Sequence, residues 1–225
     1  MQKNFTVAID GPSGAGKSTI ARRLAAHFGG VYVDTGALYR AAAVYIKNSG
    51  VSPENEGEIS RIFSESPPEI DLRQGPDGQN VFLNGSDVTR EIRLPEISTL
   101  TSKIAQSPAV RAFLLDAQRQ SATSAPFAVL DGRDIGTVVL PGATVKIFLT
   151  ASAEARAERR TAELLAQGVS VRYEDILSDN IARDTRDAVR TTAAPGAYIV
   201  DTSALSFDES FDKILSEVLR VREKA

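Results

Sequence analysis

The octapeptide Gly11-Pro12-Ser13-Gly14-Ala15-Gly16-Lys17-Ser18 constrains the fold of this chain more than any other stretch. It fits the pattern G-x-x-x-x-G-K-[ST], whose glycines let backbone N–H groups turn toward a di- or triphosphate. The mostly apolar run Phe5–Asp10 precedes it, and apolar residues at helical spacing follow it over Ile20–Phe28. This order of strand, loop and helix predicts a phosphate-binding loop (P-loop). In such a loop Lys17 reaches the terminal phosphates of a nucleoside triphosphate and the Ser18 hydroxyl ligates Mg²⁺.

Apolar runs alternate with helical patterns along the rest of the chain. We expect further strands at 31–33, 127–130, 145–149 and 197–200. We expect helices at about 37–48, 54–63, 98–106, 109–121, 153–167 and 172–191. A last helix opens with the capping box Ser206 and Glu209, and its apolar residues Phe207 to Leu219 are expected to be buried. Strands separated by helices predict an α/β fold in which helices flank a five-stranded parallel sheet.

One segment departs from this alternation. Over about 65–95, two alternating runs surround the turn residues Gly75-Pro76-Asp77-Gly78, which predicts a small antiparallel β insert. The length of 225 residues fits one domain, 1–225, with the insert and with a helical region at about 153–191.

Charge and composition exclude several classes of protein. A net charge of −3 argues against a general nucleic-acid binder, and the absence of cysteine excludes disulfides and thiolate metal sites. His27, the only histidine, excludes sites built from several histidines. No apolar run approaches the roughly 18 residues of a membrane span, and the first strand leaves no room for a signal peptide. We therefore expect a cytoplasmic protein without a membrane partner, and nothing in the sequence demands more than a monomer.

Polar clusters follow three of the predicted strands. They are the P-loop itself, Asp34-Thr35-Gly36 and Asp131-Gly132-Arg133-Asp134. Ligands of such sheets bind at the carboxyl ends of the strands, so we expect one shared site. Asp131 ends an apolar strand, as the acid that assists Mg²⁺ does in P-loop enzymes. It could instead serve as a turn or N-cap residue, and Asp10 is a weaker candidate for the metal.

Two consecutive helices carry arginine stripes. Arg156, Arg159 and Arg160 are spaced i, i+3, i+4, and Arg183, Asp187 and Arg190 are spaced i, i+4, i+7 across a hinge at Gly168. Such stripes are usually solvated faces. Beside a P-loop, however, arginines neutralise the charge of a transferred phosphoryl group, and two helices that close over the nucleotide exclude water. We therefore favour a lid at about 153–191.

The missing motifs distinguish between reaction classes. The chain has no guanine-reading N/T-K-x-D segment, and Asp131-Gly132-Arg133-Asp134 stands where a GTPase would have D-x-x-G. A small-molecule kinase fits best. A kinase for another acceptor, such as a different nucleotide or a hydroxylated acid, remains the alternative, followed by a nucleotide-dependent binding or switch protein.

Over nearly its whole length the chain resembles the bacterial cytidylate kinases. The resemblance rests on Ile9–Lys17, Asp34–Arg40, Asp131–Val139, Val145–Leu149 and Arg183–Arg190, in that order. It implies Mg²⁺-assisted phosphoryl transfer from ATP to CMP or dCMP, and a monophosphate-binding region that contains the antiparallel insert. Ser18 and Thr35 stand where some members carry Gly and Ser.

The resemblance also implies a division of roles. It implies that ATP is bound by the P-loop together with Thr19, Arg156, Arg159 and Arg160, and Mg²⁺ by Ser18 and Asp131. For the acceptor phosphate it implies Thr35, Arg40, Arg133 and Arg190; for cytosine, Ser102, Arg111 and Asp134; for the sugar, Arg183 and Asp187. Asp34 is a further expected substrate-binding residue. The catalytic residues would be Lys17, Asp131, Arg133 and Arg190.

Overall fold

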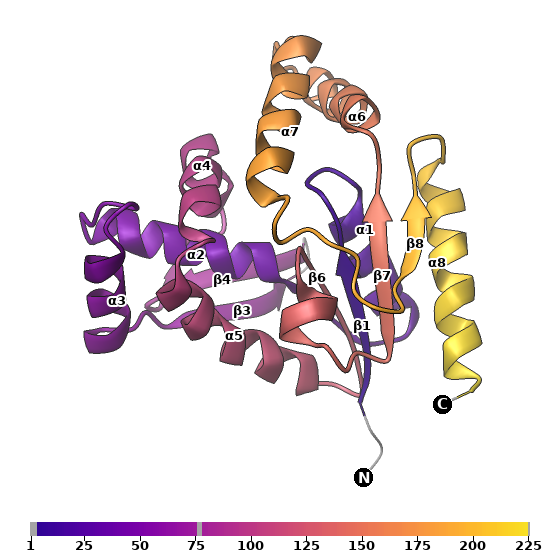
Figure 1. Ribbon diagram of the computed structural model, residues 1–225, viewed down its shortest axis with the longest axis horizontal. Helices are drawn as coiled ribbons and strands as arrows, with labels where there is room; N and C mark the ends of the chain where they lie inside the picture. Colours follow the sequence, from indigo (N-terminus) through magenta and orange to yellow (C-terminus); the bar gives the residue numbers. More distant parts are fainter. Residues whose placement is uncertain (1–3, 76–77, 225) are drawn as a thin grey trace. The chain divides into compact units, whose positions relative to one another are not determined.

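The computed structural model describes residues 4–75 and 78–224 (Figure 1). Their contacts divide the chain into two compact units. The first, which we call the P-loop unit, contains the N-terminal stretch up to Tyr32 and the chain from Ala122 onward. The second, the central unit, is Val33–Ser121.

The P-loop unit is built on the five-stranded sheet, with the strand order β2-β6-β1-β7-β8. The strands are β1 (Phe5–Asp10), β2 (Val31–Asp34), β6 (Phe127–Gly132), β7 (Val145–Thr150) and β8 (Tyr198–Asp201). The last two residues of β2, Val33 and Asp34, are counted with the central unit. β1 pairs in parallel with β6 and β7, and β7 pairs in parallel with β8. The central strands are buried, as the apolar runs predicted, and the five-stranded sheet is confirmed.

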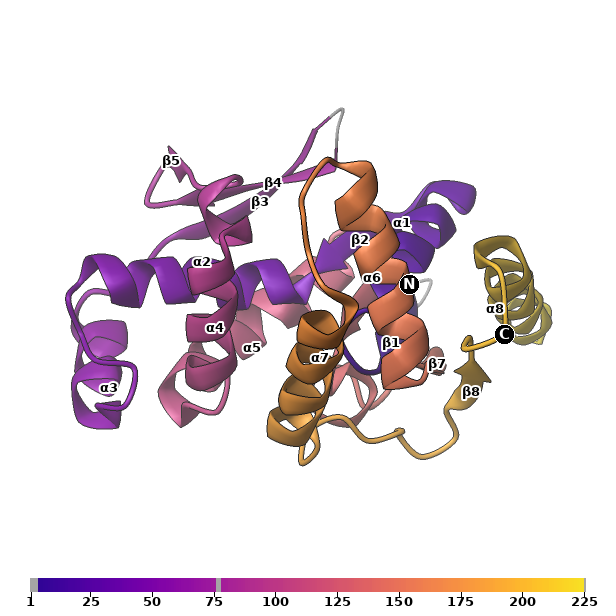
Figure 2. The same cartoon turned by 90° about the horizontal axis from the view of Figure 1, so that it is seen from above.

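Two helices pack their apolar sides into the core of this unit. They are α1 (Lys17–His27), which follows the P-loop, and α8 (Phe207–Arg222), which runs beside β8 (Figures 1 and 2). The capping box of α8 is present, with both Ser206–Glu209 bonds made. The expectation that all of its apolar residues are buried is wrong. Phe207 and Leu219 are each 40% exposed, since Phe207 is the first residue of the helix and Leu219 lies beside the buried stripe of Phe211, Ile214 and Val218.

A π-helix, η2 (Ile135–Val139), follows β6. The sequence pattern predicted no element at these residues. The Asp10 side chain of β1 accepts hydrogen bonds from the first backbone N–H groups of η2, and Asp10 lies 125 residues before Ile135 in the sequence.

The helices α6 (Ala153–Ala166) and α7 (Tyr173–Asp187) lie side by side in the P-loop unit (Figures 1 and 2). Gly168, with φ +77°, ends α6 in a left-handed conformation. Its N–H donates to Leu165 O at 3.0 Å and the Val169 N–H donates to Leu164 O at 2.9 Å. These two bonds form a Schellman motif, which reverses the chain at the predicted hinge.

The central unit contains the predicted insert. Its sheet is antiparallel and has three strands, not two: β3 (Ile70–Gly75), β4 (Gly78–Leu83) and the short β5 (Ser86–Asp87). Pro76 and Asp77 of the predicted turn lie outside the described residues. The helices are α2 (Thr35–Asn48), α3 (Glu56–Glu65), α4 (Pro95–Ile104) and α5 (Pro108–Thr123), with a 3₁₀ turn η1 (Glu91–Arg93). The alanine-rich face of α2 lets neighbouring elements pack closely, so this unit has its own apolar core.

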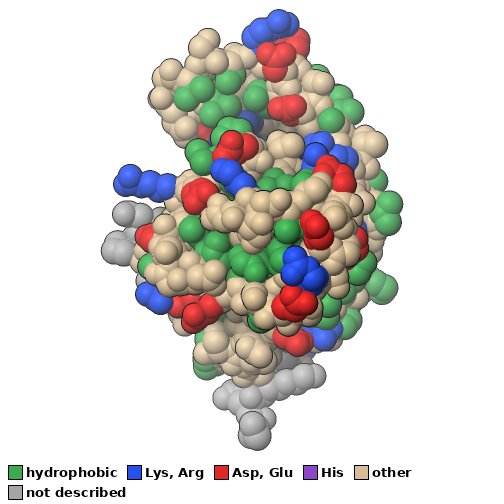
Figure 3. Space-filling view, turned by 90° about the vertical axis from the view of Figure 1, so that its left-hand side faces the viewer, with side chains coloured by type: hydrophobic (Ala, Val, Ile, Leu, Met, Phe, Trp, Pro, Cys, Tyr) green, Lys and Arg blue, Asp and Glu red, His purple; other side chains and the backbone are tan. Residues whose placement is uncertain are grey.

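The surface carries charges of both signs. On the face shown in Figure 3, lysine and arginine side chains are interspersed with aspartate and glutamate. Such a mixture is typical of solvated faces. Among the described residues, no helix is both long and apolar enough to cross a membrane.

Candidate active site

The P-loop has the backbone conformation that its glycines predict. Gly11 has φ +147°, and a Cβ there would lie 1.9 Å from the carbonyl oxygen of Leu149. Gly16, at φ +89°, is the left-handed residue from which α1 starts. Only glycine adopts these conformations without strain, so the backbone geometry requires glycine at both positions.

Lys17 is buried and bonds to the backbone of the P-loop. Its Nζ donates to Pro12 O at 2.7 Å. Burial lowers the pKa of Lys17, and the nearby Arg133 guanidinium lowers it further. A phosphate placed here would supply the negative charge that favours the protonated lysine.

Asp131 and Ser18 form the part of the site that suits a metal ion. The Ser18 Oγ donates to Asp131 Oδ2 at 2.7 Å, and the buried Tyr32 hydroxyl donates to Asp131 Oδ1 at 3.0 Å. One carboxylate and one hydroxyl are the oxygen ligands that Mg²⁺ takes when substrate phosphates complete its shell. Residues 4–75 and 78–224 contain no group of three or more His, Cys, Asp or Glu placed to hold a metal. The residues present therefore fit Mg²⁺ bound jointly with a nucleotide.

Asp10, the other candidate for the metal, has different partners. Its two carboxylate oxygens each accept a backbone N–H at 2.7 Å, from Ile135 and from Gly136. Burial raises the pKa of Asp10 to about 6, and the charge of Asp134 contributes to the rise. Asp10 thus fastens the start of η2 to the end of β1, and the geometry favours Asp131 as the metal-assisting acid.

Two arginines bond to the carboxylate of Asp187, and a third, Arg183, lies within electrostatic range of it. Asp187, at the end of α7, accepts from Arg133 Nε at 3.1 Å and from Arg190 Nη2 at 2.7 Å. Burial lowers the pKa of Arg183, and the charge of Arg133 adds to this effect. The positive charge exceeds that of the single aspartate, so this cluster is suited to an anionic ligand.

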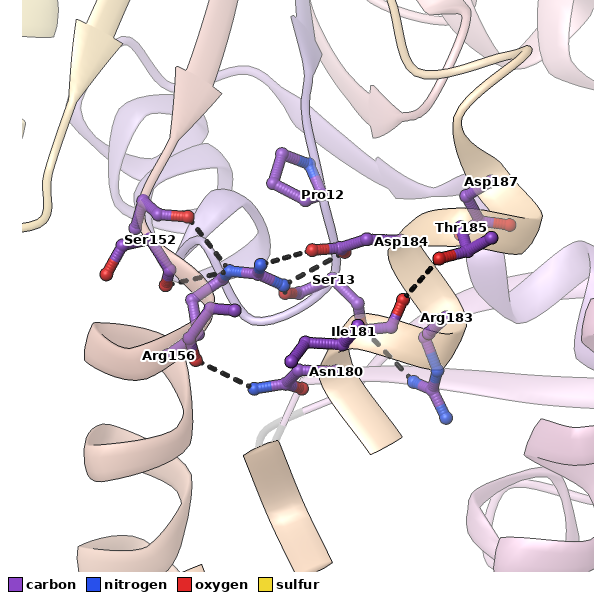
Figure 4. Close-up of polar contacts among 12 residues, drawn as sticks. Pro12, Ser13, Ser152, Arg156, Asn180, Ile181, Arg183, Asp184, Thr185 and Asp187 are labelled. Carbon is purple, nitrogen blue, oxygen red and sulfur yellow. Dashed lines mark hydrogen bonds and ion pairs between the residues drawn. The ribbon is translucent and has the colours of Figure 1, made fainter. Parts of the chain in front are cut away.

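Arg156 is the arginine of α6 that touches the P-loop (Figure 4). Its side chain is 3% exposed. Nε donates to Ala151 O at 3.0 Å, Nη1 donates to Ser13 O at 2.9 Å, and both terminal nitrogens donate to the Asp184 carboxylate. Asp184 was not among the predicted site residues.

The other two arginines of this stripe have different partners. Arg159 donates to the carbonyl and hydroxyl oxygens of Thr202, and Arg160 pairs with Glu163 on the exposed side of α6. Spacing alone put the three arginines together, whereas the structure brings one of them to the loop.

In the central unit, Asp34 and Arg40 form a pair at the start of α2. Asp34 Oδ1 accepts from the Ala37 N–H at 2.9 Å as the N-cap, and Oδ2 accepts from Arg40 Nη2 at 3.0 Å. Thr35 beside them is buried. This pair holds the arginine against the helix N-terminus.

The predicted base-reading residues are divided between the units. In the central unit, Ser102 Oγ donates to Ser98 O at 3.2 Å and Arg111 Nη1 donates to the Tyr39 hydroxyl at 3.5 Å. In the P-loop unit, Asp134 is buried at the start of η2, and its carbonyl accepts from the Val138 N–H at 2.9 Å.

Sequence reasoning missed Tyr32 and Asp184. Tyr32 lies within a short predicted strand, where its pattern does not differ from that of an ordinary core aromatic residue. Asp184 follows Arg183 in a helix rich in charges, where nothing distinguishes one acidic residue from the next.

Comparison with known proteins gives consistent matches. The family model described as cytidylate kinase matches residues 7–220. The cytidylate kinase of Carboxydothermus hydrogenoformans is 45% identical over 218 residues, which cover 95% of this chain and 97% of that protein. The cytidylate kinase of Oceanobacillus iheyensis is 42% identical over 224 residues, which cover 98% of this chain and 96% of that protein. Among solved structures, a gluconokinase from Sinorhizobium meliloti aligns with a TM-score of 0.50 at 15% identity over 100% of this chain and 97% of its own, and shows the fold alone.

Proposed function

Because the chain belongs to the cytidylate kinase family, we propose that it transfers the γ-phosphoryl group of ATP to CMP and dCMP. The observation that carries the proposal, beside the family match, is the short Ser18–Asp131 hydrogen bond at the P-loop. It joins the two groups that an Mg·ATP site needs on the protein side.

The donor is bound by the loop from Gly11 to Thr19. The backbone N–H groups and the N-terminus of α1 face the phosphates, and Lys17 neutralises their charge. Ser18 and Asp131 would hold Mg²⁺, which would supply Lewis-acid stabilisation of the phosphate charge. Arg156 borders this loop already, whereas Arg159 and Arg160 would first have to leave their present partners.

The acceptor phosphate is bound by arginines. In the P-loop unit these are Arg133 and Arg190, which Asp187 orients; in the central unit it is Arg40, which Asp34 orients and Thr35 accompanies. A planar guanidinium binds phosphate through two parallel N–H donors, so its orientation decides how well it binds. We assign the sugar to Arg183 and Asp187.

Asp134, Arg111 and Ser102 are assigned to the base. Cytosine offers an exocyclic amino donor beside acceptors, to which a carboxylate and an arginine are complementary. Uracil would place a carbonyl oxygen against Asp134, and leaving such a buried group unpaired costs about 1–3 kcal/mol. This asymmetry predicts a preference for CMP over UMP.

The reaction needs no general base from the protein. The second pKa of a phosphate monoester is near 6, so the attacking oxygen of CMP is already mostly ionised at neutral pH. That oxygen forms a bond to the γ-phosphorus while the bond to the bridging oxygen of ADP breaks. Lys17, Arg133 and Arg190 stabilise the charge that spreads over the transferred group.

ADP release with Mg·ATP and a panel of acceptors tests the proposal. The panel is CMP, dCMP, UMP, AMP, GMP and shikimate. We expect strong stimulation by CMP and dCMP and weak stimulation by UMP. Stimulation by a different acceptor would replace the cytosine assignment, and release that is independent of any acceptor would favour a switch protein.

The expectations of a cytoplasmic location and a monomer belong to the same proposal. Light scattering after size exclusion tests the second, since a monomer would have the mass of one chain, 24.1 kDa.

A further inference from the structure

Ser13 of the P-loop is contacted from both neighbouring helices. Arg156 of α6 donates to its carbonyl oxygen at 2.9 Å, and Arg183 of α7 donates to its hydroxyl at 3.2 Å (Figure 4). The two helices also bond to each other, since Asn180 Nδ2 donates to Ala153 O at 3.3 Å. A shift of either helix is therefore transmitted to this one residue of the loop.

The orientation of Arg156 depends on Asp184. Nη1 and Nη2 of the guanidinium donate to its two carboxylate oxygens, whereas the other bonds of Arg156 go to neutral carbonyl groups. The arginine is 3% exposed and the aspartate 34%. A buried guanidinium requires a compensating charge, and a bidentate pair also fixes its plane.

We propose that Asp184 is a positioning residue that couples donor binding to acceptor binding. It holds Arg156 on the Ser13 carbonyl, and it does so from α7, the helix that carries Arg183 and Asp187. This inference rests on the proposed function, in which the loop binds ATP and those two residues bind CMP. Occupation of either site then favours the helix position that suits the other, and such coupling is reciprocal.

Calorimetric titration of CMP measures this coupling directly. The dissociation constant of CMP is determined alone and with a saturating non-hydrolysable ATP analogue and Mg²⁺; the ratio of the two is the coupling factor. For the parent we expect a factor of about 5 or more, within the usual range for coupled sites. In Asp184→Asn the factor falls below about 2, while the Kd of CMP alone stays within about twofold of the parent value.

Two further variants control for charge and for folding. Asp175→Asn makes the same chemical change at an exposed position of α7 and is expected to keep the parent's factor. Asp184→Glu keeps the ion pair, so its factor should stay within about twofold of the parent's, which also provides a test if Asp184→Asn does not fold.

The outcomes separate the two proposals. A parent enzyme without CMP-stimulated ADP release refutes the proposed function. If the parent is active, three results would each overturn the inference. They are a coupling factor near 1 in the parent, an unchanged factor in Asp184→Asn, and loss of the factor in folded Asp184→Glu. An equal weakening of CMP and the analogue, each measured alone in Asp184→Asn, would also overturn it, because a merely structural role has that effect.

Discussion

Asp10 makes the stability of this protein depend on pH in a direction opposite to that of most carboxylates. Its pKa rises from 3.8 to about 6 on folding, mainly because it is buried. The protonated form is therefore favoured in the folded state. The folded protein binds more protons than the unfolded chain between these two values, so the contribution of Asp10 to stability is lost as pH rises from about 4 to 6.

The magnitude follows from the two pKa values. A rise of about 2 units corresponds to about 3 kcal/mol over the full range. Between pH 4.5 and 7.5, where the protein can be compared under similar conditions, integration gives about 2 kcal/mol.

Asp10→Asn removes this titration and keeps the shape of the side chain. The amide keeps one oxygen that accepts a backbone N–H, whereas its NH₂ group cannot accept the second one, so the variant loses one hydrogen bond at every pH. This loss does not depend on pH and leaves the change in stability between two pH values unaffected. We therefore expect the free energy of unfolding, taken as variant minus parent, to increase by about 2 kcal/mol from pH 4.5 to pH 7.5.

Urea titrations followed by circular dichroism at four pH values measure this difference. The shared titration of all other groups cancels in the subtraction. A difference that changes by less than about 0.5 kcal/mol would show that the Asp10 carboxyl titrates in the folded protein as it does in the unfolded chain, and the burial argument would then be wrong.

Three further changes act on the site itself. Gly11→Ala places a Cβ 1.9 Å from Leu149 O and should weaken ATP-analogue binding more than about tenfold in calorimetry; unchanged affinity would contradict the loop geometry. Ser18→Ala should raise the Mg²⁺ concentration for half-maximal activity severalfold at unchanged KM for CMP, and an unchanged Mg²⁺ requirement would assign the metal elsewhere. Asp187→Asn should raise KM for CMP by about tenfold or more, because two arginines lose their orienting carboxylate; an effect on KM for ATP alone would contradict the acceptor assignment.

The sequence predicted the sheet of the P-loop unit because its strands leave a clear local signal. A parallel strand buried on both faces is a continuous apolar run, and Phe127–Leu130 is such a run. The P-loop is equally local, since its glycines are required by the backbone conformation of the loop itself. The third strand of the insert, β5, has two residues, too few for any alternation to be recognised.

Partners that are distant in sequence escaped prediction. The π-helix η2 depends on Asp10, which lies 125 residues before Ile135, and its own residues show no helical period. The three arginines of α6 share a spacing, yet the angular difference between neighbouring positions sends Arg159 to Thr202 and leaves Arg160 at the surface. Spacing identifies a helix face, but the neighbours of each position decide its partner.

The acidic residues of the site matter as much as its arginines, because they orient them. Three arginines of the P-loop unit have their orientation set by a carboxylate: Arg156 by Asp184, and Arg133 and Arg190 by Asp187. Both aspartates belong to α7, one turn apart on the same side of the helix. An anionic ligand competes with these aspartates for the arginines, so α7 is the element whose position must respond when phosphate binds. With the proposed substrate assignments, the charge of both substrates would act on this one helix.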